Sequence, residues 1–302
     1  MRSLFNERVS QIEPSLQITV HSEEIHRFTQ EQPERFDEIL RSIFGSRCAS
    51  FAPRLIRGQI TEEDYSQFQC PASLDFLFIS YCAITDTVLH NWWRRSASLT
   101  WLGIRCLPFL RAIPREVMMS LSMLRTLEIH DCVQLTCLQG LNYLTSLRDL
   151  TIVECPNLIM TLEEVEKVQQ CLDRITVDDI PMVPQLLSRE GFSSLRMLCI
   201  EESDEPRAEE ILQQFPSLRT LYFDWCKWSS LPENLGTLPQ LQKLTLRWCP
   251  NVRSLPTLPV SLQSFTLRDC DKSFMNSCQT AGDPNWQKIA HVRTKEFIQD
   301  DI

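Results

Sequence analysis

The chain has 302 residues, which is enough for one large domain or two domains of ordinary size. Only 7 glycines occur against 17 prolines, and this balance argues against glycine-rich cofactor loops. The formal net charge of −9 disfavours nucleic acid as a partner, because binding to the phosphate backbone depends on lysine and arginine.

The first residues contain no apolar core of the kind that secretory signals carry. No stretch of the sequence approaches the roughly 20 consecutive apolar residues that a membrane helix needs. The 13 cysteines are an odd number and come without such a signal, so we expect a cytoplasmic protein with free thiols and no membrane partner.

Residues 1–73 are expected to form an N-terminal capping region. The segments SLQITV at 15–20 and RLIRGQI at 54–60 read as degenerate repeats, and the segment ERFDEILRSIFG at 34–45 between them reads as a helix.

From residue 74 onward the sequence repeats one phrase with the pattern L-x-x-L-x-I-x-x-C. The copies follow one another at intervals of 21 to 25 residues, which is the signature of leucine-rich repeats. Residues two apart share one face of a strand, so the apolar positions of each copy should point inward and the residues between them outward. The leading residues of the copies are Leu74, Leu99, Leu124, Leu147, Leu172, Leu195, Leu218, Leu241 and Leu262.

This periodicity predicts an α/β solenoid of about nine repeats over residues 74–270, followed by a C-terminal cap at 271–302. We expect a leucine-rich-repeat horseshoe with parallel concave strands. The convex segments should be irregular or short helices. TLEEVEKVQQCL opens with a capping box from Thr161 to Glu164, Pro206 can start another helix, and residues 229–239 carry too many prolines for a full helix. The segment NWWRR at 91–95 is expected to anchor a return segment on the convex side.

Cysteine recurs at one position of the repeat. It stands eight residues after the leader at Cys82, Cys132, Cys155, Cys226, Cys249 and Cys270, and one residue earlier at Cys106. Leucine-rich repeats place asparagine or cysteine at this position, where the strand ends. The sequence has no C-x-x-C pair of the kind that zinc sites use. We therefore predict buried, structural thiols that hold no metal.

Repeats in register turn sequence positions into columns on the surface. Seven residues after the leaders stand Tyr81, Asp131, Glu154, Asp179, Glu202, Trp225, Trp248 and Asp269. The preceding position holds His130, Asp178, Glu201, Asp224, Arg247 and Arg268, and the position directly after the leader forms a basic stripe of Arg125, Arg148, Arg196 and Arg219. The middle repeats thus present an acidic patch on the predicted concave face, and the later repeats an aromatic and basic one.

Two groups of these residues are candidates for binding a protein. Aromatic residues and arginine dominate interface hot spots, so Tyr222, Trp225, Arg247 and Trp248 are predicted to anchor the partner. Charged groups mainly set association rates, and this role is assigned to Glu154, Asp179, Glu202 and Asp224. Two alternatives stay open: the aromatic side chains pack against flanking loops, or the charged ones form a solvated face that pairs opposite charges between columns.

Several phrases carry a family resemblance. SLRDLTIVECPNL at 146–158 and LQKLTLRWCPNVRSLP at 241–256 resemble the C-terminal domain of plant intracellular nucleotide-binding leucine-rich-repeat immune receptors, most closely the coiled-coil class of grasses. The segments at 258–270 and 282–292 are similar to the end of such receptors. The resemblance implies a recognition domain that binds a pathogen effector or a host protein, or that restrains its own nucleotide-binding domain.

The sequence lacks the P-loop G-x-x-x-x-G-K-[ST] of those receptors, so we expect no nucleotide or other cofactor. His130 and Cys132 should point to different faces of one strand, and His291 has no motif beside it, so we expect no enzymatic activity. Two other functions stay open, a ubiquitin-ligase substrate adapter and a repeat-only scaffold or decoy. The adapter requires an F-box, and residues 1–73 lack its leucine–proline start.

Overall fold

The computed structural model describes residues 17–21, 75–80, 85–93, 98–159, 172–187, 189–204 and 209–300. These residues belong to two compact units, unit 1 within 1–146 and 155–159, and unit 2 within 147–154 and 160–302. The predictions for the segments at 34–45 and 54–60, for the capping box at Thr161 and for Tyr81 and Cys82 lie outside the described residues.

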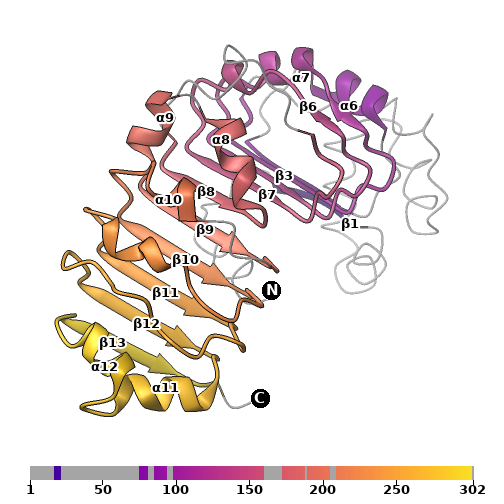
Figure 1. The fold of residues 1–302 in the computed structure, drawn as a ribbon. Coiled ribbons are helices and arrows are strands. Elements are labelled where there is room, and N and C mark those ends of the chain that lie inside the picture. Colours follow the sequence, from indigo (N-terminus) through magenta and orange to yellow (C-terminus); the bar gives the residue numbers. More distant parts are fainter. Residues whose placement is uncertain are drawn as a thin grey trace. The chain divides into compact units, whose positions relative to one another are not determined.

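Both units are built from parallel strands, one strand for each repeat (Figure 1). In unit 1 the strands follow in the order β1 (Gln17–His21), β2 (Phe76–Ser80), β3 (Trp101–Arg105) and β5 (Thr126–His130). In unit 2 the order is β7 (Asp149–Val153), β8 (Arg174–Val177), β9 (Met197–Glu201), β10 (Thr220–Asp224), β11 (Lys243–Arg247), β12 (Ser264–Arg268) and β13 (Thr294–Ile298).

The leucines set the register of these strands. From β2 to β12, each strand begins two residues after its leader, and equivalent residues of neighbouring repeats lie opposite one another, as Leu221 does between Leu198 and Leu244. From β2 to β12 the inward positions are buried, as Leu127 and Ile129 are in β5. The position between them is partly exposed in β5, where it is Glu128, but it is buried in β8, β11 and β12, where it is Thr176, Thr245 and Thr266. Stacking removes the apolar face of each strand from water, which one strand cannot do alone. The chain is therefore a leucine-rich-repeat solenoid, as the period predicts.

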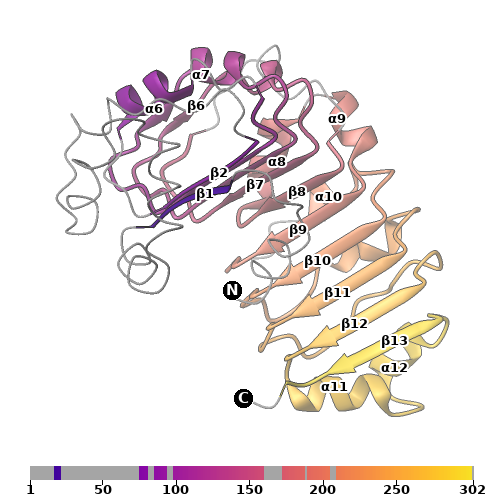
Figure 2. The ribbon, with the colours of Figure 1, turned by 180° about the vertical axis from the view of Figure 1, so that it is seen from behind.

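The segments that return from one strand to the next are short and irregular. In unit 1 they contain α6 (Asp86–Trp93), β4 (Ala112–Ile113), α7 (Arg115–Ser120), β6 (Cys137–Leu138) and the 3₁₀ helix η2 (Leu141–Tyr143). In unit 2 they contain η4 (Ile180–Met182), α8 (Val183–Leu186), α9 (Arg189–Ser194), α10 (Glu209–Leu212) and η5 (Glu233–Thr237). In unit 2, α10 lies in front of the strands in Figure 1 and behind them in Figure 2, so this return segment covers one face of the sheet.

Prolines and Trp93 shape these return segments. Between Pro232 and Pro239 only a five-residue 3₁₀ helix forms, because proline removes the backbone donors of a longer helix. Helix α10 lies in the segment that Pro206 was expected to open, although residues 205–208 are not described. Trp93, at the end of α6, is completely buried and so packs into the core as an anchor should.

Among the described residues, no helix combines the length and apolar character needed to cross a bilayer.

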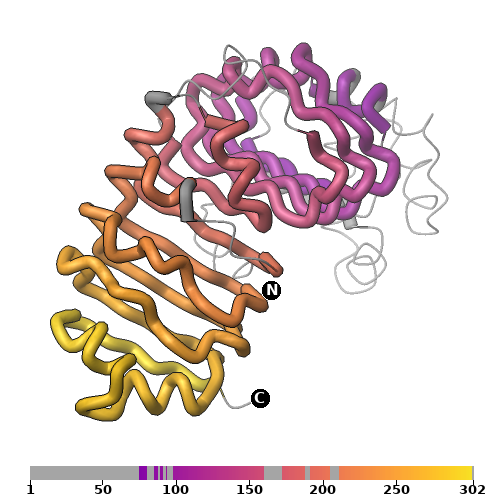
Figure 3. Tube along the Cα trace, viewed as in Figure 1, coloured from indigo at the N-terminus to yellow at the C-terminus, as the bar shows by residue number. Residues whose placement is uncertain are grey.

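The sheet continues beyond the last copy of the repeat pattern. Strand β13 pairs with β12, and the helices α11 (Lys272–Gln279) and α12 (Pro284–Ile289) fill the connection between them. Figure 3 shows this final turn of the chain at the yellow end of unit 2. The predicted cap at 271–302 therefore contains a strand that the leucine pattern does not indicate.

Candidate functional site

The chain leaves most strands through the same left-handed turn. Seven residues other than glycine have φ values between 49° and 56°, and they are Cys106, Asp131, Glu154, Glu202, Trp225, Trp248 and Asp269. The backbone amide of Trp225 donates a hydrogen bond to the carbonyl of Arg247 at 3.0 Å, and that of Trp248 donates to Arg268 at 2.9 Å. This left-handed conformation costs an ordinary residue about 1–2 kcal/mol, so the hydrogen bond to the next strand offsets part of its cost. The two tryptophans thus lie one residue beyond β10 and β11, and not on strand positions as expected.

The two tryptophans stack on each other. Their ring centroids are 4.9 Å apart with an angle of 19° between the rings, and Trp225 stays 43% exposed. The guanidinium groups of Arg247 and Arg268 lie 5.5 Å and 5.9 Å from the centroid of the Trp248 ring. Beside them, the Lys243 ammonium lies 5.6 Å from the ring of Tyr222. We call Tyr222, Trp225, Arg247, Trp248 and Arg268 the tryptophan surface. Its rings combine a large apolar area with nearby cations.

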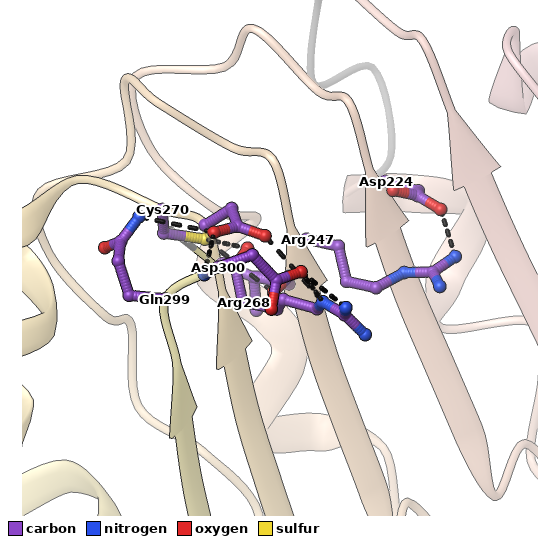
Figure 4. A network of polar contacts seen from close by, with 8 residues as sticks. Asp224, Arg247, Arg268, Cys270, Gln299 and Asp300 are labelled. Atoms are coloured by element: carbon purple, nitrogen blue, oxygen red, sulfur yellow. Dashed lines mark hydrogen bonds and ion pairs between the residues drawn. The ribbon is translucent and has the colours of Figure 1, made fainter. Parts of the chain in front are cut away.

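Asp224 does not present a free charge to a partner, contrary to its expected role. Its side chain is buried and forms an ion pair with Arg247 on the neighbouring strand (Figure 4). Burial raises the pKa of the Asp224 carboxyl, while the Arg247 guanidinium counteracts that rise. The second carboxylate oxygen of Asp224 and Nε of Arg247 are buried without a hydrogen-bond partner. This pair therefore holds a desolvated charge within the sheet.

The remaining acidic residues fall into two places. Glu202 adjoins the Asp224 pair, because its backbone amide donates to the carbonyl of Asp224 at 2.9 Å. Glu154 and Asp179 belong to earlier repeats, where the Glu154 amide donates to the Asp178 carboxylate at 2.7 Å and Asp179 precedes η4. The structure thus brings together the predicted residues of β9 to β11 and leaves Glu154 and Asp179 apart from them.

Sequence reasoning left two residues of this region off the list of partner-binding candidates. Burial, Asp224 and Glu202 raise the pKa of Glu201 to about 7, so this carboxyl titrates near neutrality. Arg268 donates to Asp300 at 2.5 Å (Figure 4). Its guanidinium group also lies over the Trp248 ring. Both residues occupy the same position of the repeat as Asp224 and Arg247. This shared position is the sequence signal that marks them as candidates for partner binding.

Five members of the cysteine column are buried as predicted, whereas Cys106, which stands one residue earlier in its repeat, is only half-buried. Cys132, Cys155, Cys226, Cys249 and Cys270 are buried free thiols. The thiol of Cys249 lies 3.3 Å from the carbonyl of Arg247 and 3.5 Å from that of Phe223 on the preceding strand, so it can donate to either oxygen. The contact with Cys226, followed by burial, raises the pKa of Cys249 to about 12. A buried thiol with a raised pKa stays protonated and can donate a hydrogen bond at the strand end. Among the described residues, histidine, cysteine and carboxylate side chains form no group suited to a metal ion.

Comparisons with known proteins give distant similarity. No family model matches the chain. A probable disease resistance protein of Arabidopsis thaliana is 23% identical over 188 residues, which are 62% of this chain. The match spans only 16% of that relative's length.

Two solved leucine-rich-repeat structures are similar to the chain. The leucine-rich-repeat domain of the type III effector XopL is 18% identical with a TM-score of 0.40, and the match covers 92% of this chain and 94% of that domain. An internalin of Listeria monocytogenes is 14% identical with a TM-score of 0.34, covering 90% of this chain and 92% of the internalin.

Proposed function

We propose that the chain is a protein-recognition module of a plant disease-resistance receptor of the nucleotide-binding, coiled-coil class, acting in the cytoplasm. Its partner is a pathogen effector, a host protein or the nucleotide-binding domain of the receptor itself. The repeat phrases and the distant match to a plant disease-resistance protein support this class of function. The solenoid supports a binding role, because such folds offer extended surfaces rather than enclosed pockets.

The observation that carries the proposal is the stacked pair of Trp225 and Trp248. Bulky residues are rare in the left-handed conformation, where asparagine and glycine are preferred. Two consecutive repeats nevertheless place tryptophan there, and the Trp225 ring remains 43% exposed. Stacking and the neighbouring guanidinium groups stabilise the pair locally, and the exposed part of the Trp225 ring remains available to a partner. A large aromatic area with adjacent arginines is the composition of an interface hot spot.

Carboxylates at the end of β9, beside the arginines of the tryptophan surface, favour basic groups at that edge of the partner. Glu201 and Glu202 adjoin the Asp224–Arg247 pair, and the mutual repulsion of these carboxylates contributes to the raised pKa of Glu201. A cation from a partner would relieve that repulsion, because an opposite charge within a few ångströms stabilises the ionised carboxylate. The partner is therefore expected to combine an apolar anchor for the tryptophans with nearby lysine or arginine.

The test replaces the tryptophans by a residue that suits their backbone. Trp225→Asn and Trp248→Asn keep the left-handed turn, so thermal stability should stay within a few degrees of the parent. Each change should weaken binding to a candidate effector or an isolated nucleotide-binding domain by about 2 kcal/mol or more in a calorimetric titration.

A matched control is Val260→Asn, which changes an apolar side chain that is 94% exposed and lies away from the tryptophan surface. It should leave both stability and binding unchanged. If Trp225→Asn and Trp248→Asn lower the melting temperature sharply without a specific binding defect, the pair is structural and the proposal is wrong.

A further inference from the structure

A second feature of unit 2 lies where its strands begin, at the opposite ends from the tryptophan turns. Here an open cavity of about 580 Å³ is lined by Arg148, Asp173, Arg196 and Arg219 together with serines 193, 194 and 217. We call it the arginine cavity. Three guanidinium groups face one carboxylate in a chain whose net charge is −9, so this local balance is opposite to that of the whole molecule.

The repeated triplet Ser-Leu-Arg builds this cavity. It occurs at 146–148, 194–196 and 217–219, and its leucine is the buried leader that fixes the position of both neighbours. Backbone hydrogen bonds then place the lining residues on successive repeats: the amide of Asp173 donates to the Arg148 carbonyl at 2.9 Å, Arg196 to Asp173 at 3.3 Å, and Arg219 to Arg196 at 2.8 Å. Neighbouring strands lie about 4.8 Å apart, so Arg196 and Arg219 carry like charges within reach of the same small group.

The charges of Arg196 and Arg219 are not balanced within the cavity. Asp173 lies 3.8 Å from Arg196, and both side chains are about half exposed or more, so this pair is weak. Within the described part of the chain, no carboxylate lies within ion-pair distance of Arg219. The hydroxyl of Ser194 donates to the Gly191 carbonyl at 3.1 Å, whereas those of Ser193 and Ser217 have no hydrogen-bond partner among the described residues. The cavity thus offers several donors and a single charged acceptor.

We infer that the arginine cavity binds a phosphate group, carried either by a protein side chain or by a small phosphorylated molecule. Guanidinium groups match phosphate oxygens with paired hydrogen bonds, and serine hydroxyls supply further donors. A dianion between Arg196 and Arg219 removes the repulsion between the two guanidinium groups. The carboxylate of Asp173 repels the dianion and so weakens its binding. Because strands β9 and β10 separate this cavity from the tryptophan turns, the site is distinct from the tryptophan surface.

The experiment measures binding of three probes by calorimetry at low ionic strength. The probes are inorganic phosphate, fructose 1,6-bisphosphate, and a pool of phosphoserine peptides compared with the same pool without phosphate. Preference for the peptide pool assigns the ligand to a protein side chain, and preference for the sugar bisphosphate assigns it to a small molecule. Arg219→Gln should weaken the tightest phosphorylated probe about tenfold, because it removes charged hydrogen bonds.

Two further variants make the result specific. Asp173→Asn removes the opposing carboxylate and should strengthen the same probe severalfold. Arg125→Gln is the matched control, since Arg125 stands at the same repeat position in unit 1, where methionine replaces the serine before the leader, and it should hardly change binding. Melting curves establish that each variant is folded. The inference is wrong if no phosphorylated probe binds, or if Arg125→Gln weakens binding as much as Arg219→Gln.

Discussion

At the scale of single residues, the last two positions of the repeat phrase, the cysteine and the residue before it, have different structural roles. The cysteine turns inward and its thiol can donate to strand carbonyls, so its polar atom is satisfied where the strand stops. The residue before it adopts the left-handed turn, and its identity varies from Asp131 to Trp225. The cysteine position therefore stabilises the end of each strand, and the position before it determines which side chain follows the strand at the turn.

Glu201 should make the stability of the protein depend on pH. Its pKa is raised from 4.5 to about 7 in the folded state, chiefly by burial and then by Asp224 and Glu202. The folded state therefore binds the proton more tightly than the unfolded chain, and stability is lost as pH rises between about 4.5 and 7. Glu201→Gln removes this loss, so it should stabilise the protein at pH 8 by on the order of 2 kcal/mol more than at pH 4.5.

Urea unfolding at the two pH values measures this difference. Glu233→Gln, which changes a carboxylate exposed to solvent at the start of η5, serves as the control and should show no such pH dependence. A Glu201→Gln variant with equal effects at both pH values would contradict the expected linkage.

At the scale of elements, a buried asparagine links the helices of the C-terminal cap to the last repeats, in addition to the pairing of β13 with β12. Asn285, in the first turn of α12, accepts a hydrogen bond from the Leu255 amide at 2.8 Å. Its amide group donates to the Arg253 carbonyl at 3.1 Å and to the Ser277 hydroxyl at 2.8 Å. Helix α11, helix α12 and the segment before β12 thus share a single polar centre, which allows β13 to close the sheet.

Asn285→Ala should therefore destabilise the cap. The change removes three hydrogen bonds and leaves the buried Leu255 amide unsatisfied, which costs about 2–3 kcal/mol. Urea unfolding is the measurement, with Asn276→Ala as the control because that asparagine is exposed on α11. Equal loss of stability in the two variants would show that Asn285 does not hold the cap.

The sequence predicts these elements as far as the leucine pattern extends. Buried leucines two residues before each strand of the main sheet fix where the strands from β3 to β12 begin, because one register buries all of them. Strand β13 escapes the pattern because Lys295 occupies the position of its second leucine. Register also predicts that Trp225 and Trp248 are neighbours, but not that they leave the strand, since the left-handed turn comes from backbone bonding between repeats. Which charges pair, as Asp224 and Arg247 do, depends on side-chain placement that spacing does not encode.

At the scale of the whole molecule, the solenoid makes stability local along the chain. Each strand contacts only the strands before and after it, so the free energy is approximately a sum of repeat terms and neighbour terms. The first inward residue of β11 is Leu244, which is completely buried and lies between Leu221 and Phe265 on the adjoining strands. Shortening the Leu244 side chain would leave a cavity that removes packing contacts from the repeats of β10, β11 and β12 and from no other repeat directly.

Leu244→Ala should accordingly cost about 3 kcal/mol or more, the range for a large-to-small change in a packed core. Hydrogen exchange followed by mass spectrometry should show the largest loss of protection in β10, β11 and β12, a smaller loss in β8, and none in β2 and β3 of unit 1. Lys243→Ala changes an exposed side chain on the same strand and should leave protection nearly unchanged. If Leu244→Ala lowers protection equally in both units, the chain opens as one cooperative block, and stability is not transmitted from neighbour to neighbour.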